Sequence, residues 1–347
     1  MVPVTKYVIC ETNALEHENN AGPKARIDIS QIALSSGWKP LVVRSEFPQN
    51  RFSAFVPVFN DYARIAHSLR RDDILLLQFP LGTYLPVSIP VLPLLRLAKR
   101  KGVKIIELIH DLDSIRGRSN YYEKHYFALA DVLIAHNERM KAYLEQRYDK
   151  PIVSLEIFDY LVPNPAAIHR PESGIDIAGT LDPSKAKYVY KTAAEIPDAP
   201  LNLYGIKFAQ SSPARKWYRG EYAPDALLAH LIGKFGLVWD GASTETCSGI
   251  YGKYLKYNDP HKLSLYLASN KPIFIWDQAA EADFVREHHV GFTVPTIADA
   301  IQKFHTLTSD EYSDLQNNAQ ATGARLRDGY YTRRAISKSL EVLGLIL

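Results

Sequence analysis

The sequence predicts an α/β protein made of two Rossmann-like, doubly wound domains. Short β-rich runs alternate with helical patterns along the chain, which is the order of elements in parallel sheets covered on both faces. The 347 residues exceed one ordinary domain and suit two domains of ordinary size. Residues 161–173 contain Pro163, Pro165 and Pro171 without periodic apolar residues, which indicates a linker. We therefore expect domains at 1–160 and 174–325.

Composition excludes several classes of protein. The formal net charge of +3 is too small for a strong nucleic-acid footprint. Cys10 and Cys247 lie far apart and form neither a disulfide framework nor a metal-ligand cluster, which favours a reducing cytoplasm. The sequence has no signal-peptide pattern and no run of 18 apolar residues, so we expect a cytoplasmic protein that binds no nucleic acid and does not span a membrane.

Six short apolar or β-branched runs predict the strands of the first domain. They are Lys6–Cys10, Leu41–Val43, Asp73–Gln78, Lys104–Ile109, Val132–Ala135 and Ile152–Leu155. The loop after the first strand leads into a helix over Lys24–Ser36, and ligands bind at such strand ends in doubly wound sheets. Asn20, Gly22 and Lys24 are therefore candidate substrate contacts, with a plain connecting loop as the alternative. The spacing does not match G-x-G-x-x-G, so NAD is not predicted.

The helical pattern Val87–Lys101 ends in a basic cluster that complements its C-terminal dipole. Contact with the inner face of an anionic membrane is the alternative for this cluster.

A polar segment, His110 to Arg116, follows the strand Lys104–Ile109. Side chains at the carboxyl end of a parallel strand would face the cleft between the two predicted domains. Three interpretations compete. Asp111 and Asp113 match a D-x-D metal pattern, which the two-domain organisation disfavours. Asp113 or Ser114 could instead cap a turn. The third makes Asp111 or His110 the general base for an acceptor hydroxyl, with Arg116 contacting the acceptor.

The strands expected in the second domain are Ile175–Ala178, Leu201–Tyr204, Phe235–Trp239, Ile273–Trp276 and Gly291–Val294. Thr180 follows the first of them. Tyr204 and Gly205 end the second, where the Tyr could stack on a base or lie in the core, and the Gly could let a ligand approach the backbone. The long loop 240–252 is expected to close over a ligand.

The stretch from Tyr254 to Ser269 predicts an anion site. Asn258 and Asp259 are preferred N-cap residues, and Pro260 suits the first helical position. The amides of a helix start attract anions, and Lys256, His261 and Lys262 surround this one, so a diphosphate is the expected ligand. We assign Asp259 to capping because its carboxylate would repel phosphate. Solvated lysines and a capping His261 are the alternative.

This run, with Tyr251-Gly252 before it and the strand from Pro272 after it, resembles the C-terminal nucleotide-sugar motif of a bacterial glycosyltransferase family. That family includes the glucosyltransferases that add the second sugar to serine-rich-repeat adhesins and the related β-1,6-galactofuranosyltransferases. The resemblance implies a GT-B fold: two domains facing across a cleft, with the donor nucleotide held mainly by the C-terminal domain and usually no catalytic metal. It also implies that residues 326–347 form a helix crossing back to the first domain.

Three further segments are similar to the family. The segment Asn20 to Lys24 is comparable to a small-residue and Lys segment that faces the interdomain cleft. His110-Asp111-Leu112 is similar to a His-Asp-Leu segment, which favours the general-base interpretation. Thr180 stands where the family more often has Asn. A contact with the sugar donor at this position would therefore be made by a hydroxyl and not by an amide.

The predicted function is transfer of a hexose, galactofuranose or glucose, from a UDP-sugar to a glycan, glycolipid or glycoprotein acceptor. A base implies inversion at the anomeric carbon, and no metal or other cofactor is expected. The alternatives are a non-catalytic sugar-nucleotide- or glycan-binding partner and a nucleotide-sugar epimerase, which the missing G-x-G-x-x-G turn disfavours. The apolar face of the last helix could also serve an interface in a homo-oligomer.

Overall fold

The computed structural model describes residues 4–11, 21–44, 51–80, 85–117, 121–165, 168 and 171–345. The described residues form two compact units. The first draws on the segments Met1–Glu16, Arg26–Leu155 and Thr332–Leu347, and the second on His17–Ala25 and Glu156–Tyr331. The chain therefore changes unit at Leu155, ahead of the proline-rich residues, and residues from Thr332 onward group with the first unit.

The first unit contains a six-stranded sheet in the order β2-β1-β3-β4-β5-β6, with every neighbouring pair parallel. Its strands are β1 (Lys6–Glu11), β2 (Lys39–Val43), β3 (Ile74–Phe79), β4 (Lys104–Ile109), β5 (Val132–Ala135) and β6 (Ile152–Ser154). All six predicted strands are present. Every residue of β3 is buried, as expected for a central parallel strand covered on both faces.

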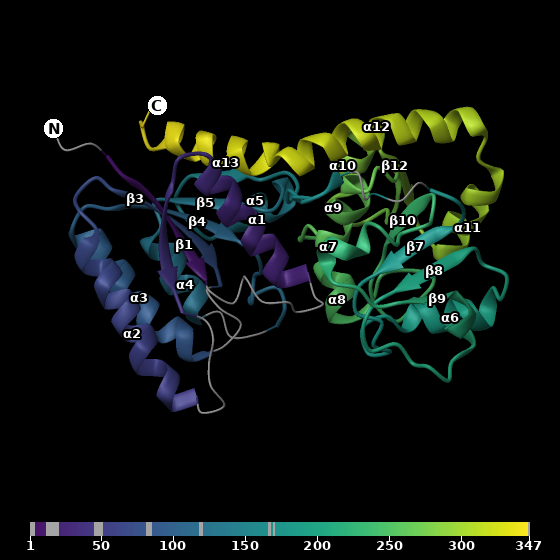
Figure 1. Cartoon of the computed structure of the whole chain (residues 1–347), viewed down its shortest axis with the longest axis horizontal. Helices are drawn as coiled ribbons and strands as arrows, with labels where there is room; N and C mark the ends of the chain where they lie inside the picture. Colours follow the sequence, from purple (N-terminus) through teal and green to yellow (C-terminus); the bar gives the residue numbers. More distant parts are fainter. Residues whose placement is uncertain are drawn as a thin grey trace. The chain divides into compact units, whose positions relative to one another are not determined.

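Helices connect these strands (Figure 1). They are α1 (Ala21–Ser35), α2 (Arg51–Ser68), α3 (Leu85–Arg100), α4 (Tyr121–Leu129) and α5 (Glu138–Glu145), and α13 (Tyr330–Val342) ends the chain. The side chain of Asn137 caps α5 by accepting a hydrogen bond from the Met140 amide. The basic end of the expected helix 87–101 lies in α3, where Lys99 pairs with Asp131 at 2.7 Å. No helix in the described ranges is long and apolar enough to cross a membrane.

The second unit contains another parallel six-stranded sheet, in the order β12-β11-β10-β7-β8-β9. Its strands are β7 (Ile175–Ala178), β8 (Leu201–Tyr204), β9 (Tyr218–Gly220), β10 (Phe235–Val238), β11 (Ile273–Trp276) and β12 (Gly291–Val294). The expected strands are again present. The edge strand β9 was not predicted, because its three residues, Tyr-Arg-Gly, carry no strand pattern.

The helices of this unit (Figure 1) are α6 (Lys187–Glu195), the 3₁₀ helix η3 (Pro213–Trp217), α7 (Pro224–Leu227), α8 (Gly249–Tyr254), α9 (His261–Ala268), α10 (Ala282–Glu287), α11 (Ile297–Thr306) and α12 (Ser309–Asp328). A capping box between Thr308 and Glu311 starts α12, and Gly329, with a φ of 77°, ends it. The loop expected at 240–252 is shorter than predicted, because α8 begins at Gly249.

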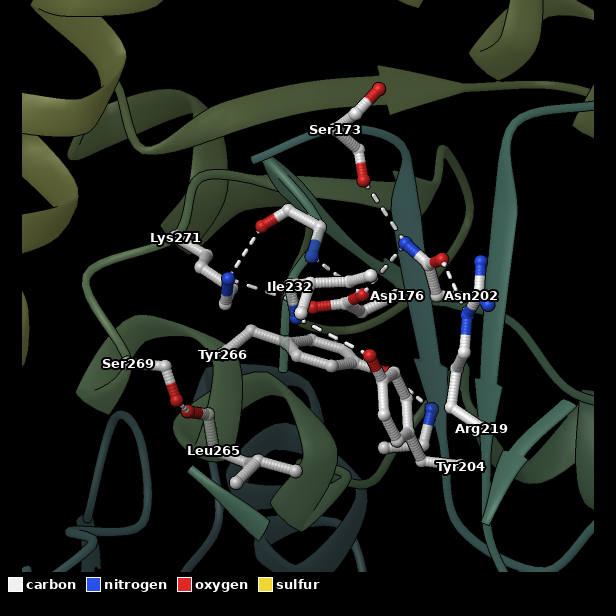
Figure 2. A network of polar contacts seen from close by, with 12 residues as sticks. Ser173, Asp176, Asn202, Tyr204, Arg219, Ile232, Leu265, Tyr266, Ser269 and Lys271 are labelled. Carbon is white, nitrogen blue, oxygen red and sulfur yellow. Dashed lines mark hydrogen bonds and ion pairs between the residues drawn. The ribbon is translucent and has the colours of Figure 1, made fainter. Parts of the chain in front are cut away.

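A buried polar network pins the amino ends of the strands in the second unit (Figure 2). Lys271, just before β11, lies 3.6 Å from Asp176 of β7, and both side chains are completely buried. The Asp176 carboxylate also accepts hydrogen bonds from the Gly233 amide at 2.8 Å and from Asn202 of β8 at 3.3 Å. Arg219 of β9 donates to Asn202. Burial raises the pKa of Asp176 to about 6, against the opposing effect of Lys271.

Candidate functional site

In the first unit, His110 lies at the carboxyl edge of the sheet, immediately after β4. Its ring Nε2 is 2.8 Å from Oε1 of Gln78, the polar residue near the end of β3. The strand register explains the contact: Gln78 is paired with Leu108, and His110, two residues further on, lies on the same face. The backbone amide of His110 donates to the Phe79 carbonyl at 2.7 Å, which extends the β3–β4 pairing to this position.

Asp111 and Arg116, the two other predicted residues of this segment, form an ion pair. Arg116 Nη1 is 2.9 Å from Asp111 Oδ2, and the side chains are 25% and 34% exposed. The turn between them is anchored by Ser114, whose amide and hydroxyl donate to the Glu123 carboxylate at 3.1 and 2.8 Å. Ser114 therefore anchors the turn to α4. The structure brings His110, Asp111 and Arg116 to one end of the first sheet, as the sequence predicts.

His136 follows β5 at the same edge and was not singled out from the sequence. Its side chain is buried, and burial lowers its pKa to about 3, against hydrogen bonds to the backbone of Ile109 and His110. His136 is therefore neutral at physiological pH. It forms hydrogen bonds with the backbone of the segment that carries His110.

The first predicted substrate contacts lie at the start of α1. Asn20 lies outside the described residues, and Gly22 is in the first turn of the helix, which begins at Ala21. Lys24 is buried; its Nζ donates to the Leu161 carbonyl at 2.8 Å and pairs with Asp225 at 2.9 Å. Lys24 also lies over the Tyr160 ring. The expectation of an available substrate-binding lysine is therefore corrected: this cation already has protein partners within the second unit.

In the second unit, α9 starts one residue later than predicted and with different capping. Pro260 is the N-cap itself, and no side chain of the described residues caps the helix. Asp259 is buried and instead accepts a 2.6 Å hydrogen bond from the amide of Phe158. Burial raises the pKa of Asp259 to about 7. The capping role expected for Asp259 is wrong, because its carboxylate holds the segment that follows β6.

Lys262, in the first turn of α9, reaches the carboxyl end of β10. Its Nζ donates to the Trp239 carbonyl at 2.9 Å and to Asp240 Oδ1 at 3.0 Å, and the two side chains of this ion pair are 15% and 12% exposed. The contact places the start of α9 at the carboxyl edge of the second sheet. It also corrects the alternative of a solvated lysine. Lys256 is exposed and lies over the Trp276 ring at 5.4 Å.

His261 and Asn258 complete this helix start. Burial lowers the pKa of His261 to about 3, helped by nearby Lys24, so the ring is neutral and does not add the positive charge expected of it. The ring packs 4.9 Å from that of Tyr160. The carbonyl oxygen of the Asn258 side chain is buried and has no hydrogen-bond partner among the described residues. An unsatisfied buried acceptor costs about 1–3 kcal/mol, which a ligand donor could recover.

Two of the remaining donor candidates have structural roles instead. Tyr204 is 1% exposed and its hydroxyl accepts from the Ile232 amide, so the ring lies in the core and has no free face for a base. Gly205 has a φ of 150°, and a Cβ there would lie 1.7 Å from the Gly179 carbonyl oxygen. Glycine is required at position 205 because the backbone that follows β7 occupies the space of a side chain; the free space is not left for a ligand. Thr180 is half-buried at the carboxyl edge, beside this contact.

The structure shows three contacting residues that the sequence analysis missed. Gln78 contacts His110, Asp240 pairs with Lys262, and the Arg26 guanidinium donates to the Gln78 carbonyl. The signal for Gln78 was present, since it is the one polar residue in the buried strand Ile74–Phe79. Asp240 and Arg26 carried no such signal, because their partners are distant in sequence. Among the described residues, no group of three or more His, Cys, Asp and Glu side chains has the arrangement of a metal site.

Two comparisons of the sequence identify its relatives. The family described as Glucosyltransferase 3-like matches in both parts, with its N-terminal domain over residues 6–157 and its C-terminal domain over 175–339. The chain is 32% identical to the Beta-1,6-galactofuranosyltransferase WbbI of Escherichia coli K12 over 285 residues, covering 79% of this chain and 81% of the relative. It is 24% identical to Glucosyltransferase 3 of Streptococcus parasanguinis, over 80% of this chain and 81% of that protein.

Among solved structures, a sucrose-phosphate synthase from Thermosynechococcus elongatus superposes with a TM-score of 0.67 at 11% identity, covering 99% of this chain and 100% of that one. This likeness, with two parallel six-stranded sheets, defines the class as the GT-B fold of glycosyltransferases. The chain belongs to the Glucosyltransferase 3-like family, and the resemblance first seen in residues 251–276 is confirmed over both domains.

Proposed function

We propose that this protein transfers a hexose, galactofuranose or glucose, from a UDP-sugar to a hydroxyl of a glycan, glycolipid or glycoprotein. Membership of the Glucosyltransferase 3-like family and the match to a galactofuranosyltransferase over most of both chains support a hexosyltransferase. UDP as the nucleotide follows from the resemblance of the motif around α9. We place this activity in the cytoplasm, with contact to the inner membrane face as a further part of the proposal.

The donor is assigned to the carboxyl edge of the second sheet. The observation that carries this assignment is the buried Asn258 side-chain oxygen at the start of α9, which lacks a partner among the described residues. It would accept a hydrogen bond from a hydroxyl of the donor, on either the ribose or the hexose. The amides of the first turn of α9 and Lys256 would face the diphosphate and stabilise the charge that develops as UDP leaves.

The deprotonation step is assigned to the first unit. The acceptor oxygen attacks the anomeric carbon, the bond from that carbon to the diphosphate oxygen breaks, and the hydroxyl proton passes to His110 or Asp111. A single displacement of this kind inverts the anomeric configuration. Arg116, paired with Asp111, would orient the carboxylate or contact the acceptor. No metal and no cofactor beyond the donor is part of the proposal.

Release of UDP from a panel of UDP-sugars, including UDP-galactofuranose and UDP-glucose, tests the activity with and without candidate acceptors. UDP release that requires an acceptor supports transfer. Binding without release by any donor and acceptor would favour a non-catalytic binding protein, and conversion of one UDP-sugar into another would favour an epimerase.

The donor site is tested by Asn258→Ala. The variant should bind the UDP-sugar about tenfold more weakly, the equivalent of one hydrogen bond, without loss of thermal stability, because the deleted acceptor has no partner among the described residues. Asn317→Ala, at an exposed position of α12, is the matched control. Comparing UDP with the UDP-sugar in calorimetry tells whether the ribose or the hexose supplies the hydroxyl. Unchanged affinity for both ligands would remove Asn258 from the site.

A further inference from the structure

The side chain of Gln78 is held in one orientation by three polar groups. Its Nε2 lies 3.2 Å from the carbonyl oxygen of Arg26 and 3.0 Å from the hydroxyl of Ser30, both on α1. A backbone carbonyl can only accept a hydrogen bond, so the group facing Arg26 must be the NH₂ of the amide. The amide oxygen therefore points the other way, toward His110 Nε2 at 2.8 Å.

This orientation decides the tautomer of His110. An amide oxygen only accepts, so Nε2 of the ring must carry the proton and donate it to Gln78. In the neutral ring the lone pair then lies on Nδ1. We propose that Gln78 is a positioning residue that holds His110 in the Nε2–H tautomer, so that Nδ1 is the atom that receives the proton of the acceptor hydroxyl.

The surroundings show that this arrangement is built into the fold. Gln78 is 3% exposed and belongs to β3, every residue of which is buried. Arg26 also contacts the end of β3, because its guanidinium donates hydrogen bonds to the carbonyls of Gln78 and Pro80. The same guanidinium lies 3.8 Å from the carboxylate of Glu11, at the end of β1. Arg26 and Ser30 are four residues apart on α1 and so present one face to Gln78.

The charged and titratable groups near His110 fit this assignment. Asp111 is paired with Arg116, and His136, packed against the backbone of Ile109 and His110, is neutral because burial lowers its pKa. Gln78 is itself uncharged, so it fixes the proton position without adding a charge to the ring. The inference rests on the proposed role of His110 as general base, but the tautomer can be measured independently of activity.

The tautomer is read directly from the ¹⁵N shifts of the full chain labelled at histidine, with the His110 signals assigned by their loss in His110→Gln. We expect Nε2 protonated and Nδ1 unprotonated in the wild type. Gln78→Met removes the acceptor and should release this preference. Gln78→Glu keeps an acceptor oxygen and should retain the Nε2–H tautomer. Ser30→Ala removes one partner of Gln78 but leaves the Arg26 carbonyl, so it is the control and should retain the tautomer as well.

Kinetics separate positioning from a purely structural role. Gln78→Met should lower kcat about tenfold with the donor KM unchanged, since a misplaced base slows the chemical step. In Gln78→Glu the carboxylate would stabilise the imidazolium, so the acidic limb of the kcat profile should move to higher pH.

A wild-type His110 ring protonated on Nδ1 overturns the inference whatever the activity. If the tautomer is as expected but His110→Gln turns over normally, the base assignment fails instead. If Gln78→Met, Gln78→Glu and Ser30→Ala lose kcat equally, with no change in the His110 tautomer or in the pH profile of kcat, Gln78 only supports the fold.

Discussion

The buried ion pair between Lys271 and Asp176 yields a pH-dependent prediction for Lys271→Met. Both side chains are completely buried, and burial raises the pKa of Asp176 from its ordinary 3.8 to about 6. Because the folded pKa is the higher one, the favourable contribution of Asp176 is fully present below about pH 4 and is lost as the pH rises through about 6. Removing Lys271 removes the cation that lies 3.6 Å from the buried carboxylate and offsets its charge.

The magnitude follows from the two protonation states. At pH 8 the shift from 3.8 to 6 costs the wild type about 3 kcal/mol, at 1.4 kcal/mol per pKa unit. Without Lys271 the carboxyl must take up a proton, and protonation at pH 8 from an unfolded pKa of 3.8 costs about 6 kcal/mol. The variant is therefore less stable by about 3 kcal/mol at pH 8. At pH 5 Asp176 is already largely protonated in the wild-type fold, so this difference falls close to zero.

Differential scanning calorimetry at pH 5 and pH 8 checks this result. For a domain of this size, 3 kcal/mol corresponds to a loss of about 6–12 °C in Tm at pH 8, with a far smaller loss at pH 5. Asn at position 176 keeps the oxygen that accepts from Gly233, so the double variant Lys271→Met/Asp176→Asn should recover most of the loss at pH 8. Lys191→Met, at an exposed position of α6, is the control. An equal loss at both pH values in Lys271→Met would refute the role given to Asp176.

Three further predictions concern the site. Asp111→Asn should lower turnover by roughly 10² or more with UDP affinity nearly unchanged, and His110→Gln measured beside it decides which residue is the base; near-normal turnover in Asp111→Asn leaves that carboxylate as the partner of Arg116. Activity should survive EDTA; a loss restored by manganese would revive the D-x-D interpretation. Lys262→Ala should weaken UDP binding and, because it leaves Asp240 half of a broken, largely buried pair, should also lower Tm; adding Asp240→Asn should restore Tm but not UDP affinity. Restored affinity in that double variant would confine Lys262 to a structural role.

Sequence pattern alone predicted both parallel sheets and all of their strands except the short edge strand β9. Runs such as Ile74–Phe79 and Ile273–Trp276 are short, apolar and bounded by turns, and these local properties are sufficient to predict buried parallel strands. The same reasoning brought His110 and Asp111 to a strand end, because residues that follow a parallel strand lie at the edge where ligands bind. The motif around α9 was sufficient to identify the family.

The contacts of each side chain in these places follow from how the strands and helices pack, and not from the sequence pattern. Lys262 was expected to be free, but Asp240 lies beside it because β10 ends next to α9. Gly205 was expected to admit a ligand, but the backbone of Gly179 fills that space. The tautomer of His110 depends on Gln78, 32 residues earlier, and the orientation of Gln78 depends on Arg26, a further 52 residues earlier. Propensity and periodicity act over a few neighbouring residues, whereas hydrogen-bond and ion-pair partners are set by which strands and helices pack together, and no local pattern carries that information.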